Sequence, residues 1–430
     1  MKNKCIPYLG AALLLSAVGL SAQEADSEDR IDALRARVEQ LEAPATGGIP
    51  LNAAWQNGLR LQSSDGQIHL QIGGRVHLDF AGVDAESAVD EEIDGVKSGT
   101  GFRRSRVYFS GRLYEHGLFR VEYDFLGGNA VMRDAHIGVM NVPYLGTIRA
   151  GRMLEYYSIE ALSGNSFHQF MERGLSAAFN EYWNNGIGIQ NSVLDGRGSW
   201  AVGASKRTDT FGTSDTNSQH NVSARITAAP VYDNDGATWF HLGLGAIQRK
   251  PDNDEYRIRS RPESSVAPVF VDTGDVPSDR VNLVGLELAA AHGPASIQSE
   301  WHQARVNLIE ADEFPHSGHA RLSGYYVYAS YFLTGEHRTY NPNTGTFGRV
   351  SPRSNFRGEG SGLGAWEIGI RHSELDLNDD PIAGGQLRNL TVGVNWYLNP
   401  NMRVMANYVH ADLNDVGKAD ILQARVQFDF

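Results

Sequence analysis

Apolar and polar residues alternate along most of this chain, and the alternation continues to its last residue. In residues 423–430 the apolar positions are Ala424, Val426, Phe428 and Phe430, with polar or charged residues between them. Successive side chains of a strand point to opposite faces, so this strand has one apolar face and one charged face. Such a strand suits a wall between lipid and water, and it predicts the closing strand of an outer-membrane β-barrel.

The same period of two recurs from residue 67 onward. The predicted strands are 67–80, 102–115, 117–126, 132–142, 146–152, 184–195, 197–206, 219–230, 236–249, 280–291, 294–304, 321–334, 362–372, 386–398, 402–412 and 418–430. About 16 strands would leave an aqueous lumen, so the expected fold class is all-β, a transmembrane antiparallel β-barrel. A water-soluble sandwich shows the same alternation, and the pattern alone leaves that alternative open.

The connections between these strands differ in length. Short connections, such as 116–117 and 292–294, alternate with long polar connections at 81–101, 207–218, 250–279 and 335–361. This asymmetry is typical of periplasmic turns and extracellular loops. Segment 153–183 is rich in aromatic residues and Met, and we expect it to fold inward and narrow the pore. Aromatic girdles at the two membrane interfaces are expected from Tyr325, Tyr326, Tyr328, Tyr331, Trp396, Tyr397 and Tyr408.

The N-terminal residues predict export. Lys2 and Lys4 precede an apolar run that ends in small residues, so residues 1–22 are interpreted as a cleaved signal peptide. No later stretch reaches about eighteen consecutive apolar residues, so entry into a membrane would require strands. The expected location is the outer membrane of a Gram-negative bacterium.

Between the signal and the barrel, two further segments are predicted. Residues 23–43 carry an a/d seam of Ile31, Leu34, Val38 and Leu41, which predicts a short periplasmic coiled-coil helix. A single amphipathic helix on a surface remains the alternative. Residues 44–66 contain Pro and Gly and are interpreted as a linker, and residues 67–430 as the barrel.

The charged residues restrict the choice of ligand. A net charge of -13 argues against nucleic acid as a partner. Only six of the 38 Lys and Arg residues are lysine, so arginine supplies nearly all of the positive charge. The planar arginine fork suits oxyanions better than the point charge of lysine does. Cys5 is the only cysteine and lies in the predicted signal, so no disulfide is expected in the mature protein.

Several short motifs occur in order along the chain. They are Gly101-Phe102-Arg103-Arg104-Ser105-Arg106, Glu122-Tyr123-Asp124-Phe125, Met171-Glu172-Arg173, Leu333-Thr334-Gly335-Glu336-His337-Arg338, Gly364-Ala365-Trp366-Glu367 and Gly393-Val394-Asn395-Trp396-Tyr397. Together they resemble the motifs of the phosphate-selective porin family, from about residue 67 to residue 430. The resemblance implies a trimeric outer-membrane channel whose lumen carries arginines that attract phosphate or polyphosphate.

The same resemblance implies particular anion-binding residues. It places constriction arginines at Arg103, Arg104 and Arg173, an aspartate beside them at Asp134, an early arginine at Arg75, and an arginine ladder at Arg257, Arg259 and Arg261. The chain also departs from the family pattern. Leu118 stands where the family can have a lysine, Phe80 and Arg106 stand where it has tyrosines, and the ladder ends before Pro262. Anion preference therefore carries over better than phosphate preference.

Strand geometry bears on these arginines. Adjacent strand residues face opposite sides, so either a bulge turns both Arg103 and Arg104 inward or one of them lies above the membrane. Simple alternation instead puts Arg104 and Arg106 together on the lumen side. Arg257, Arg259 and Arg261 project on one side of an extended segment, where a solvated charge run in an exposed loop is the alternative. For Arg173 the alternative to an anion site is a structural ion pair with Glu172 or Asp134.

Other functional classes find less support in the sequence. His316 and His319 lack a third ligand, so a polar loop is favoured over a metal site. The sequence has none of the common hydrolase, nucleotide-binding or metalloprotease motifs, and we expect no cofactor, no metal and no catalysis. The predicted function is the passive diffusion of small anions through the channel, with phosphate as the first candidate. The expected partners are small anions, outer-membrane lipid and lipopolysaccharide, and further copies in a homotrimer. A general or sugar-preferring porin is the first alternative, and a barrel hydrolase or adhesin is the second.

Overall fold

The computed structural model describes residues 49–180, 183–213, 220–311, 314–358 and 362–430. The predictions for the signal peptide and for the coiled-coil helix concern residues outside these ranges. Residues 52–430 form one compact unit. No helix among the described residues is long and apolar enough to span a bilayer.

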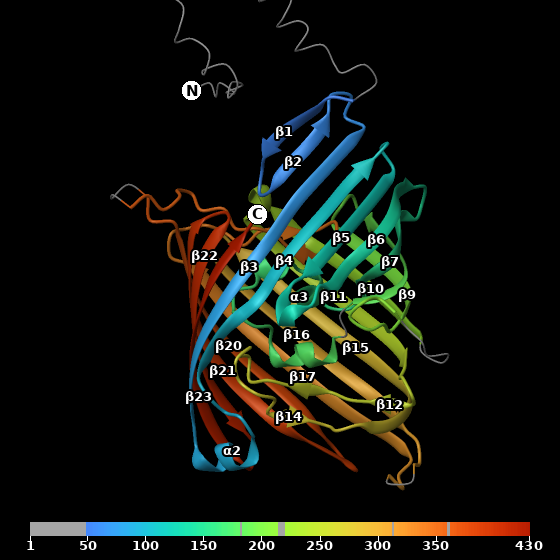
Figure 1. Cartoon of the computed structure of the whole chain (residues 1–430), viewed down its shortest axis with the longest axis vertical. Helices are drawn as coiled ribbons and strands as arrows, with labels where there is room; N and C mark the ends of the chain where they lie inside the picture. Colours follow the sequence, from blue (N-terminus) through green and yellow to red (C-terminus); the bar gives the residue numbers. More distant parts are fainter. Residues whose placement is uncertain (1–48, 181–182, 214–219, 312–313, 359–361) are drawn as a thin grey trace, which may run out of the picture. The chain divides into compact units, whose positions relative to one another are not determined.

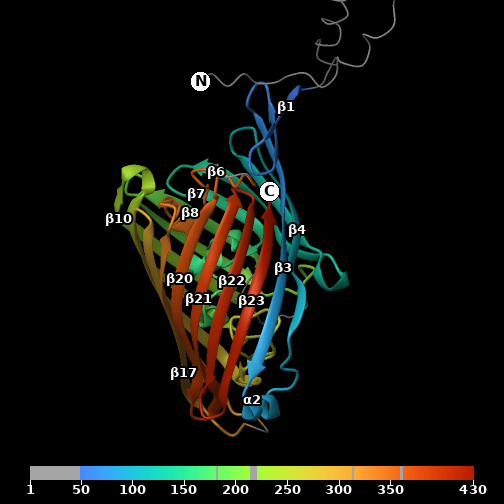
Figure 2. The same cartoon turned by 90° about the vertical axis from the view of Figure 1, so that its left-hand side faces the viewer.

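Within the described residues, 16 long strands pair antiparallel in chain order, and the last strand pairs with the first to close a barrel (Figures 1 and 2). The strands are β3 (Ile68–Ala85), β4 (Gly99–Leu113), β5 (Gly117–Asp124), β6 (Val131–Val142), β7 (Gly146–Leu154), β8 (Trp183–Val193), β9 (Gly198–Lys206), β10 (His220–Asp233), β11 (Thr238–Lys250), β15 (Val276–His292), β16 (Ala295–Leu308), β17 (Gly318–Phe332), β20 (Ala365–Asp379), β21 (Ile382–Asn399), β22 (Met402–Leu413) and β23 (Gly417–Asp429). Each predicted strand overlaps one of them. The predicted fold class is confirmed.

The strands are apolar outside and polar inside. On β15, Leu286 is 50% exposed on the outer wall, whereas its neighbour Glu287 is 3% exposed on the inner wall. On β20, Ile370 and Arg371 differ in the same way. A soluble sandwich would bury its apolar face, so this inversion identifies a wall that meets lipid.

Three of the predicted girdle tyrosines point the other way. Tyr326, Tyr328 and Tyr397 are buried inside the barrel. Their neighbours Tyr325 and Trp396 lie on the outer face, because adjacent strand residues cannot share a face. The girdle prediction is therefore wrong for the three inward tyrosines.

One long connection lies at the opposite end from the one expected. Strand direction alternates, so the connection after β17, described at residues 333–358 and 362–364, lies at the same end as the short turns 114–116, 234–237 and 293–294. It contains β18 (Tyr340–Asn341) and β19 (Thr346–Phe347), and Tyr340 stacks on Trp239 of β11 at 4.7 Å between ring centroids. The prediction that all the long connections share one end is wrong, because length alone does not set the end. Short turns typically face the periplasm, so this segment is a periplasmic one that enters the lumen.

Part of the predicted linker is also structured. β1 (Leu51–Trp55) and β2 (Leu59–Ser63) form a hairpin, and β2 pairs with the start of β3. All of β1 is exposed, so the hairpin has no buried apolar face that could have marked it as strand in the sequence.

A segment between β7 and β8 folds into the lumen, as predicted. It contains α3 (Ile159–Leu162), η2 (Asn165–Phe167) and η3 (Leu175–Phe179). Wall arginines donate to its backbone carbonyl oxygens. Arg403 reaches His168 at 2.7 Å, Arg371 reaches Glu172 at 3.0 Å, and Arg249 reaches Phe179 at 3.3 Å. We call residues 155–180 the inward segment.

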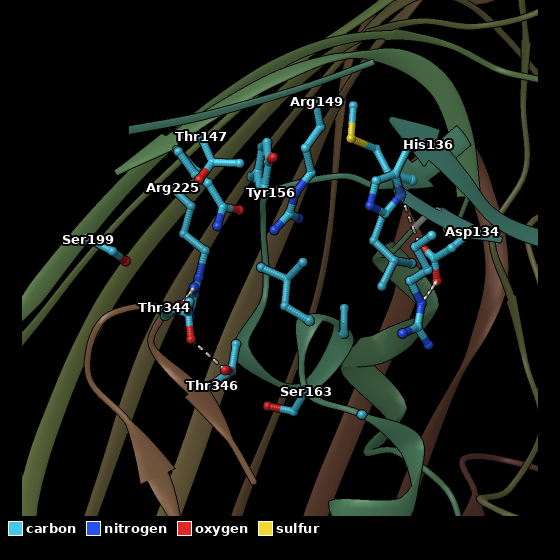
Figure 3. A pocket seen from close by; sticks show the side chains of 18 of the residues that line it. Asp134, His136, Thr147, Arg149, Tyr156, Ser163, Ser199, Arg225, Thr344 and Thr346 are labelled. Atoms are coloured by element: carbon cyan, nitrogen blue, oxygen red, sulfur yellow. Dashed lines mark hydrogen bonds and ion pairs between the residues drawn. The ribbon is translucent and has the colours of Figure 1, made fainter. Parts of the chain in front are cut away.

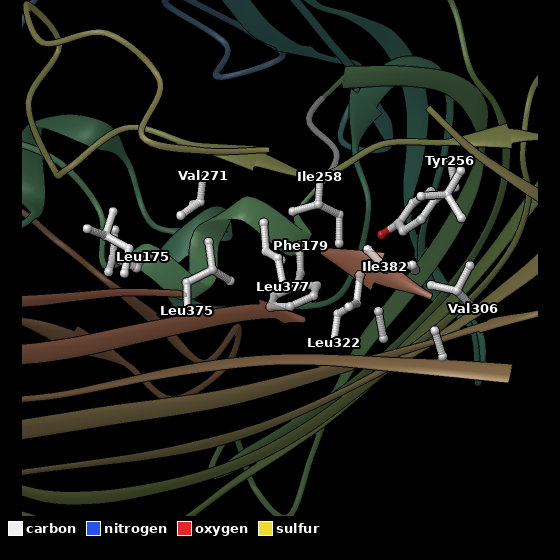
Figure 4. Close-up of a cluster of buried hydrophobic side chains, with 14 of the residues drawn as sticks. Leu175, Phe179, Tyr256, Ile258, Val271, Val306, Leu322, Leu375, Leu377 and Ile382 are labelled. Carbon is white, nitrogen blue, oxygen red and sulfur yellow. The ribbon is translucent and has the colours of Figure 1, made fainter. Parts of the chain in front are cut away.

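A hydrophobic core holds the inward segment at the long-loop end of the lumen (Figure 4). Leu175 and Phe179 of η3 pack there with Ile258 and Val271 from the β11–β15 connection and with inward side chains of the wall. That connection contains β12 (Glu255–Tyr256), β13 (Arg259–Ser260) and β14 (Val271–Asp272), and α2 (Ser87–Glu92) lies between β3 and β4.

Candidate functional site: arginines at a lumen constriction

Two cavities lie on either side of the inward segment. The outer cavity, of about 840 Å³, is lined by the start of β4, by residues 172–180 and by the β11–β15 connection. The inner cavity, of about 600 Å³, is lined by β3 to β10, by residues 161–165 and by residues 343–346. Arg173 lines both of them. Arg173 therefore lies where the two cavities approach each other.

The inward segment itself positions Arg173. Its guanidinium donates to the backbone carbonyl of Glu160 at 3.1 Å and to Oδ1 of Asn165 at 2.6 Å. The side chain is only partly buried. The arginine is therefore fixed in place while its charge remains close to both cavities.

A β-bulge turns Arg103 and Arg104 to the same side. His77 of β3 pairs with Arg104, whereas the next residue, Leu78, pairs with Phe102, so Arg103 is the extra residue. Arg103 makes two hydrogen bonds of 2.9 Å to Glu172 of the inward segment, and Nη1 of Arg104 lies 3.9 Å from the same carboxylate. The structure therefore has the bulge that the sequence analysis gave as one way to turn both Arg103 and Arg104 inward.

Glu172 is shared by several arginines. Arg425 of β23 also lies 2.7 Å from it and binds Asp79 through two hydrogen bonds. Burial alone would raise the pKa of Glu172, but the charges of Arg103, Arg425 and Arg104 outweigh it and hold the pKa well below the usual value. The carboxylate is therefore ionised throughout the physiological pH range.

Arg75 and Arg106 sit in an ion-pair cluster on the inner-cavity wall. Arg75 lies 3.4 Å from Glu122, and Arg106 binds Glu122 at 3.2 Å and Asp124 at 2.8 Å. Arg120 bridges Glu122 and Asp134, with 3.6 Å to the latter. The sequence did not single out Arg120. Asp134, expected beside the constriction, lines the inner cavity as part of this cluster.

The three ladder arginines differ in their surroundings. Arg257, Arg259 and Arg261 are exposed and alternate with less exposed residues, as an extended segment requires. Arg259 and Arg261 line the outer cavity. Arg257 binds Asp272 through hydrogen bonds of 2.8 and 2.7 Å, and these bonds raise its pKa above the ordinary value. Asp272 reaches it through the β13–β14 pairing, which no local pattern indicates.

The structure shows where two of the residues that depart from the family pattern lie. Phe80 is 45% exposed on the outer wall, so its ring lies outside the pore and the correspondence with a pore tyrosine is wrong. Leu118 shares the inner-wall side of β5 with Glu122. Among the described residues, no group of three or more His, Cys, Asp or Glu side chains is placed to hold a metal ion.

A closed 16-stranded barrel with an apolar outer wall and an inward segment that divides its lumen defines a porin. A model of the family "phosphate-selective porin O and P" matches residues 70–430, and the chain belongs to this family of outer-membrane channels.

Individual proteins agree with this assignment. Porin O of Pseudomonas aeruginosa is 23% identical over 414 residues, which cover 86% of this chain and 89% of the relative. The outer membrane channel DcaP of Acinetobacter baumannii superimposes with a TM-score of 0.53 at 10% identity, covering 86% of this chain and 99% of that structure. An anion-selective porin from Comamonas acidovorans gives a TM-score of 0.50 at 14% identity, with 84% and 100% covered. At these identities the solved structures show the fold alone.

Proposed function

We propose that this porin is an anion-selective channel for the passive uptake of phosphate or polyphosphate, and that Arg173 is its narrowest anion site. The observation that carries the proposal is the position of Arg173 between the two cavities. Arg103, Arg104, Arg259 and Arg261 contribute positive potential on the outer side, and Arg75, Arg106 and Asp134 belong to the inner side. Weak sites in series let an anion enter and also leave, as conduction requires.

The alternative of a general porin calls for arginines and carboxylates on opposite walls, so that a transverse field crosses the lumen. Here Glu122 and Asp124 lie on β5, within 3.4 Å of arginines on the adjacent β4 and on β3, the next strand along the same wall. Paired charges on neighbouring strands neutralise one another locally and set up little field across the lumen. This arrangement favours the anion channel over the general porin.

The test is planar-bilayer recording of single channels in a chloride gradient, with phosphate added stepwise. For the wild type we expect an anion-selective reversal potential and saturable block by phosphate. Arg173→Gln removes charge-assisted hydrogen bonds worth about 1.5–3 kcal/mol and should weaken the block at least about tenfold. Arg173→Lys keeps the positive charge but loses the guanidinium contacts to Glu160 and Asn165. This variant therefore distinguishes the effect of the charge from the effect of the anchoring contacts.

Two results would contradict the proposal of an anion channel with its narrowest site at Arg173. If Arg173→Gln leaves both the reversal potential and the block unchanged, Arg173 is not the anion site. If the wild type is cation-selective or is not blocked by phosphate, the channel is a general porin. Arg60→Gln, on the exposed β2, removes the same charge away from the lumen and serves as control.

We also propose a homotrimer. Its support is the a/d seam predicted for residues 23–43, which would tie three copies together on the periplasmic side. Native mass spectrometry in detergent, with and without residues 23–43, tests this, and a monomer in both preparations would contradict it.

A further inference from the structure

Two arginines that line the inner cavity, Arg149 and Arg225, have no part in the site described above. Arg149 lies on β7 and reaches from the wall into the cavity between Tyr156 and His136 (Figure 3). Its Nε is buried and has no hydrogen-bond acceptor among the described residues, and no ion pair to a described carboxylate involves Arg149. A buried donor without an acceptor is costly, and an oxyanion bound in the cavity would supply an acceptor to this guanidinium.

Five other arginines line this cavity, and four of them pair with carboxylates of the described residues: Arg75, Arg106, Arg120 and Arg225. Arg225 binds Glu287 through hydrogen bonds of 2.8 and 2.7 Å, and Arg120 bridges Glu122 and Asp134. The carboxylates neutralise much of the positive charge of the arginines that they bind. Arg149 interacts electrostatically with His136 and Tyr156, and neither of these is an anion at neutral pH.

The facing wall offers hydroxyl groups. Thr344 and Thr346 project from the periplasmic segment with their hydroxyl oxygens 2.7 Å apart, and Ser199 and Ser163 lie nearby (Figure 3). Arg225 donates to the backbone carbonyls of Thr344 at 3.0 Å and Gly345 at 2.8 Å, which holds this wall in place. Hydroxyls both donate and accept, so this wall can bind the hydroxyl groups of a ligand as well as its oxyanion.

The size of the cavity agrees with such a ligand. Its volume of about 600 Å³ falls within the range of pockets that enclose small organic molecules. A phosphate monoester of a hydroxylated carrier fills more of this volume than inorganic phosphate does.

We propose that the inner cavity binds a phosphate monoester of a hydroxylated organic carrier, with the phosphate on Arg149 and the carrier's hydroxyls on the wall of Ser199, Thr344 and Thr346. The proposal rests on the anion-channel function proposed above and names the ligand class of its inner site. Arg173 would select for negative charge, and the inner site would then distinguish the ester from inorganic phosphate.

The experiment compares three probes in single-channel block of the full-length protein, each added to either side in turn: inorganic phosphate, glucose 6-phosphate and glucose. For the wild type we expect glucose 6-phosphate to block at about tenfold lower concentration than phosphate, and glucose not to block. Arg149→Gln should abolish the preference for the ester. Thr344→Val with Thr346→Val should reduce it while leaving the block by phosphate unchanged.

Arg152→Gln is the matched control. Arg152 is on the same strand but donates to the carbonyl of Met132, and it lines a groove separate from the inner cavity. Normal single-channel conductance of each variant shows that it folds and inserts.

The outcomes separate the inner site from the channel function. Equal block by phosphate and its ester in the wild type, or an ester preference that survives Arg149→Gln, overturns the inner site while phosphate block at Arg173 stands. A wild-type channel that no phosphate compound blocks overturns both. Loss of the ester preference in Arg149→Gln but not in Arg152→Gln supports the proposal.

Discussion

Replacing Glu172 by glutamine removes the carboxylate that Arg103, Arg104 and Arg425 share at the constriction. Because its pKa is held well below the usual value, Glu172 carries a full negative charge at neutral pH, and the variant removes that charge. Glutamine retains an oxygen that accepts from Arg103. Arg425 keeps its two hydrogen bonds to Asp79, at 2.6 and 2.7 Å, so it does not become a buried unpaired charge.

The size of the effect follows from the position of the charge. The side chain of Glu172 is 15% exposed, so bulk water screens it only in part. At an effective dielectric of about 20, a unit charge about 8 Å from a bound anion contributes about 2 kcal/mol, or about thirtyfold in affinity. We therefore expect Glu172→Gln to bind phosphate more tightly, by up to that factor, and to shift the reversal potential further toward that of the anion.

The assay is phosphate block of single channels at several ionic strengths, combined with thermal unfolding in detergent. Glu374→Gln removes a carboxylate from the outer wall, where it lies 3.5 Å from Arg388, and serves as the control for net charge. If Glu172→Gln inserts with normal conductance but binds phosphate no more tightly than the wild type, the arginines around Glu172 do not face the anion path.

Two further predictions concern the anchoring of the inward segment. Burial and the neighbouring Glu300 raise the pKa of Glu160 to about 8, so the stability that this carboxyl contributes is complete below its unfolded pKa of about 4.5 and is lost as the pH rises through about 8. We expect anion selectivity to fall between pH 7 and 9 in the wild type but not in Glu160→Gln, measured as reversal potential, and a flat wild-type profile would contradict this. A methyl group added at Gly245 would lie 2.1 Å from the carbonyl oxygen of Tyr157, so Gly245→Ala should displace the segment and increase current noise and conductance. Gly358→Ala, which places its methyl group in open space, should behave as the wild type, and an identical current in Gly245→Ala would refute the close contact.

The alternation of side chains predicted the barrel because a strand between lipid and water must alternate in polarity along its whole length. The same rule also decides which face of the wall individual side chains occupy. Tyr325 and Tyr326 are adjacent and cannot both face lipid, and Ile148 and Ala150 on the outer wall place Arg149 inside. The alternation thus marks Arg149 as a lumen residue, although Arg149 belongs to none of the family motifs, which include Arg103 and Arg173.

Other features depend on contacts between distant parts of the chain. The pairing of Arg257 with Asp272 needs the small β13–β14 sheet, and the sharing of Glu172 needs Arg425, 253 residues further along the chain. The position of the connection after β17 depends on counting strand directions rather than on its polar composition. Local pattern therefore located the wall of the pore better than it located the partners inside it.

The wall arginines that hold the inward segment bind its backbone carbonyl oxygens rather than its side chains. Every residue type has that carbonyl, so these hydrogen bonds persist whatever amino acid stands at the contacted position. Residues of the segment that face the cavities are therefore open to substitution without loss of these anchors. The same scaffold could diverge toward new solutes through changes in one short stretch of sequence, and protein engineers could exploit it in the same way.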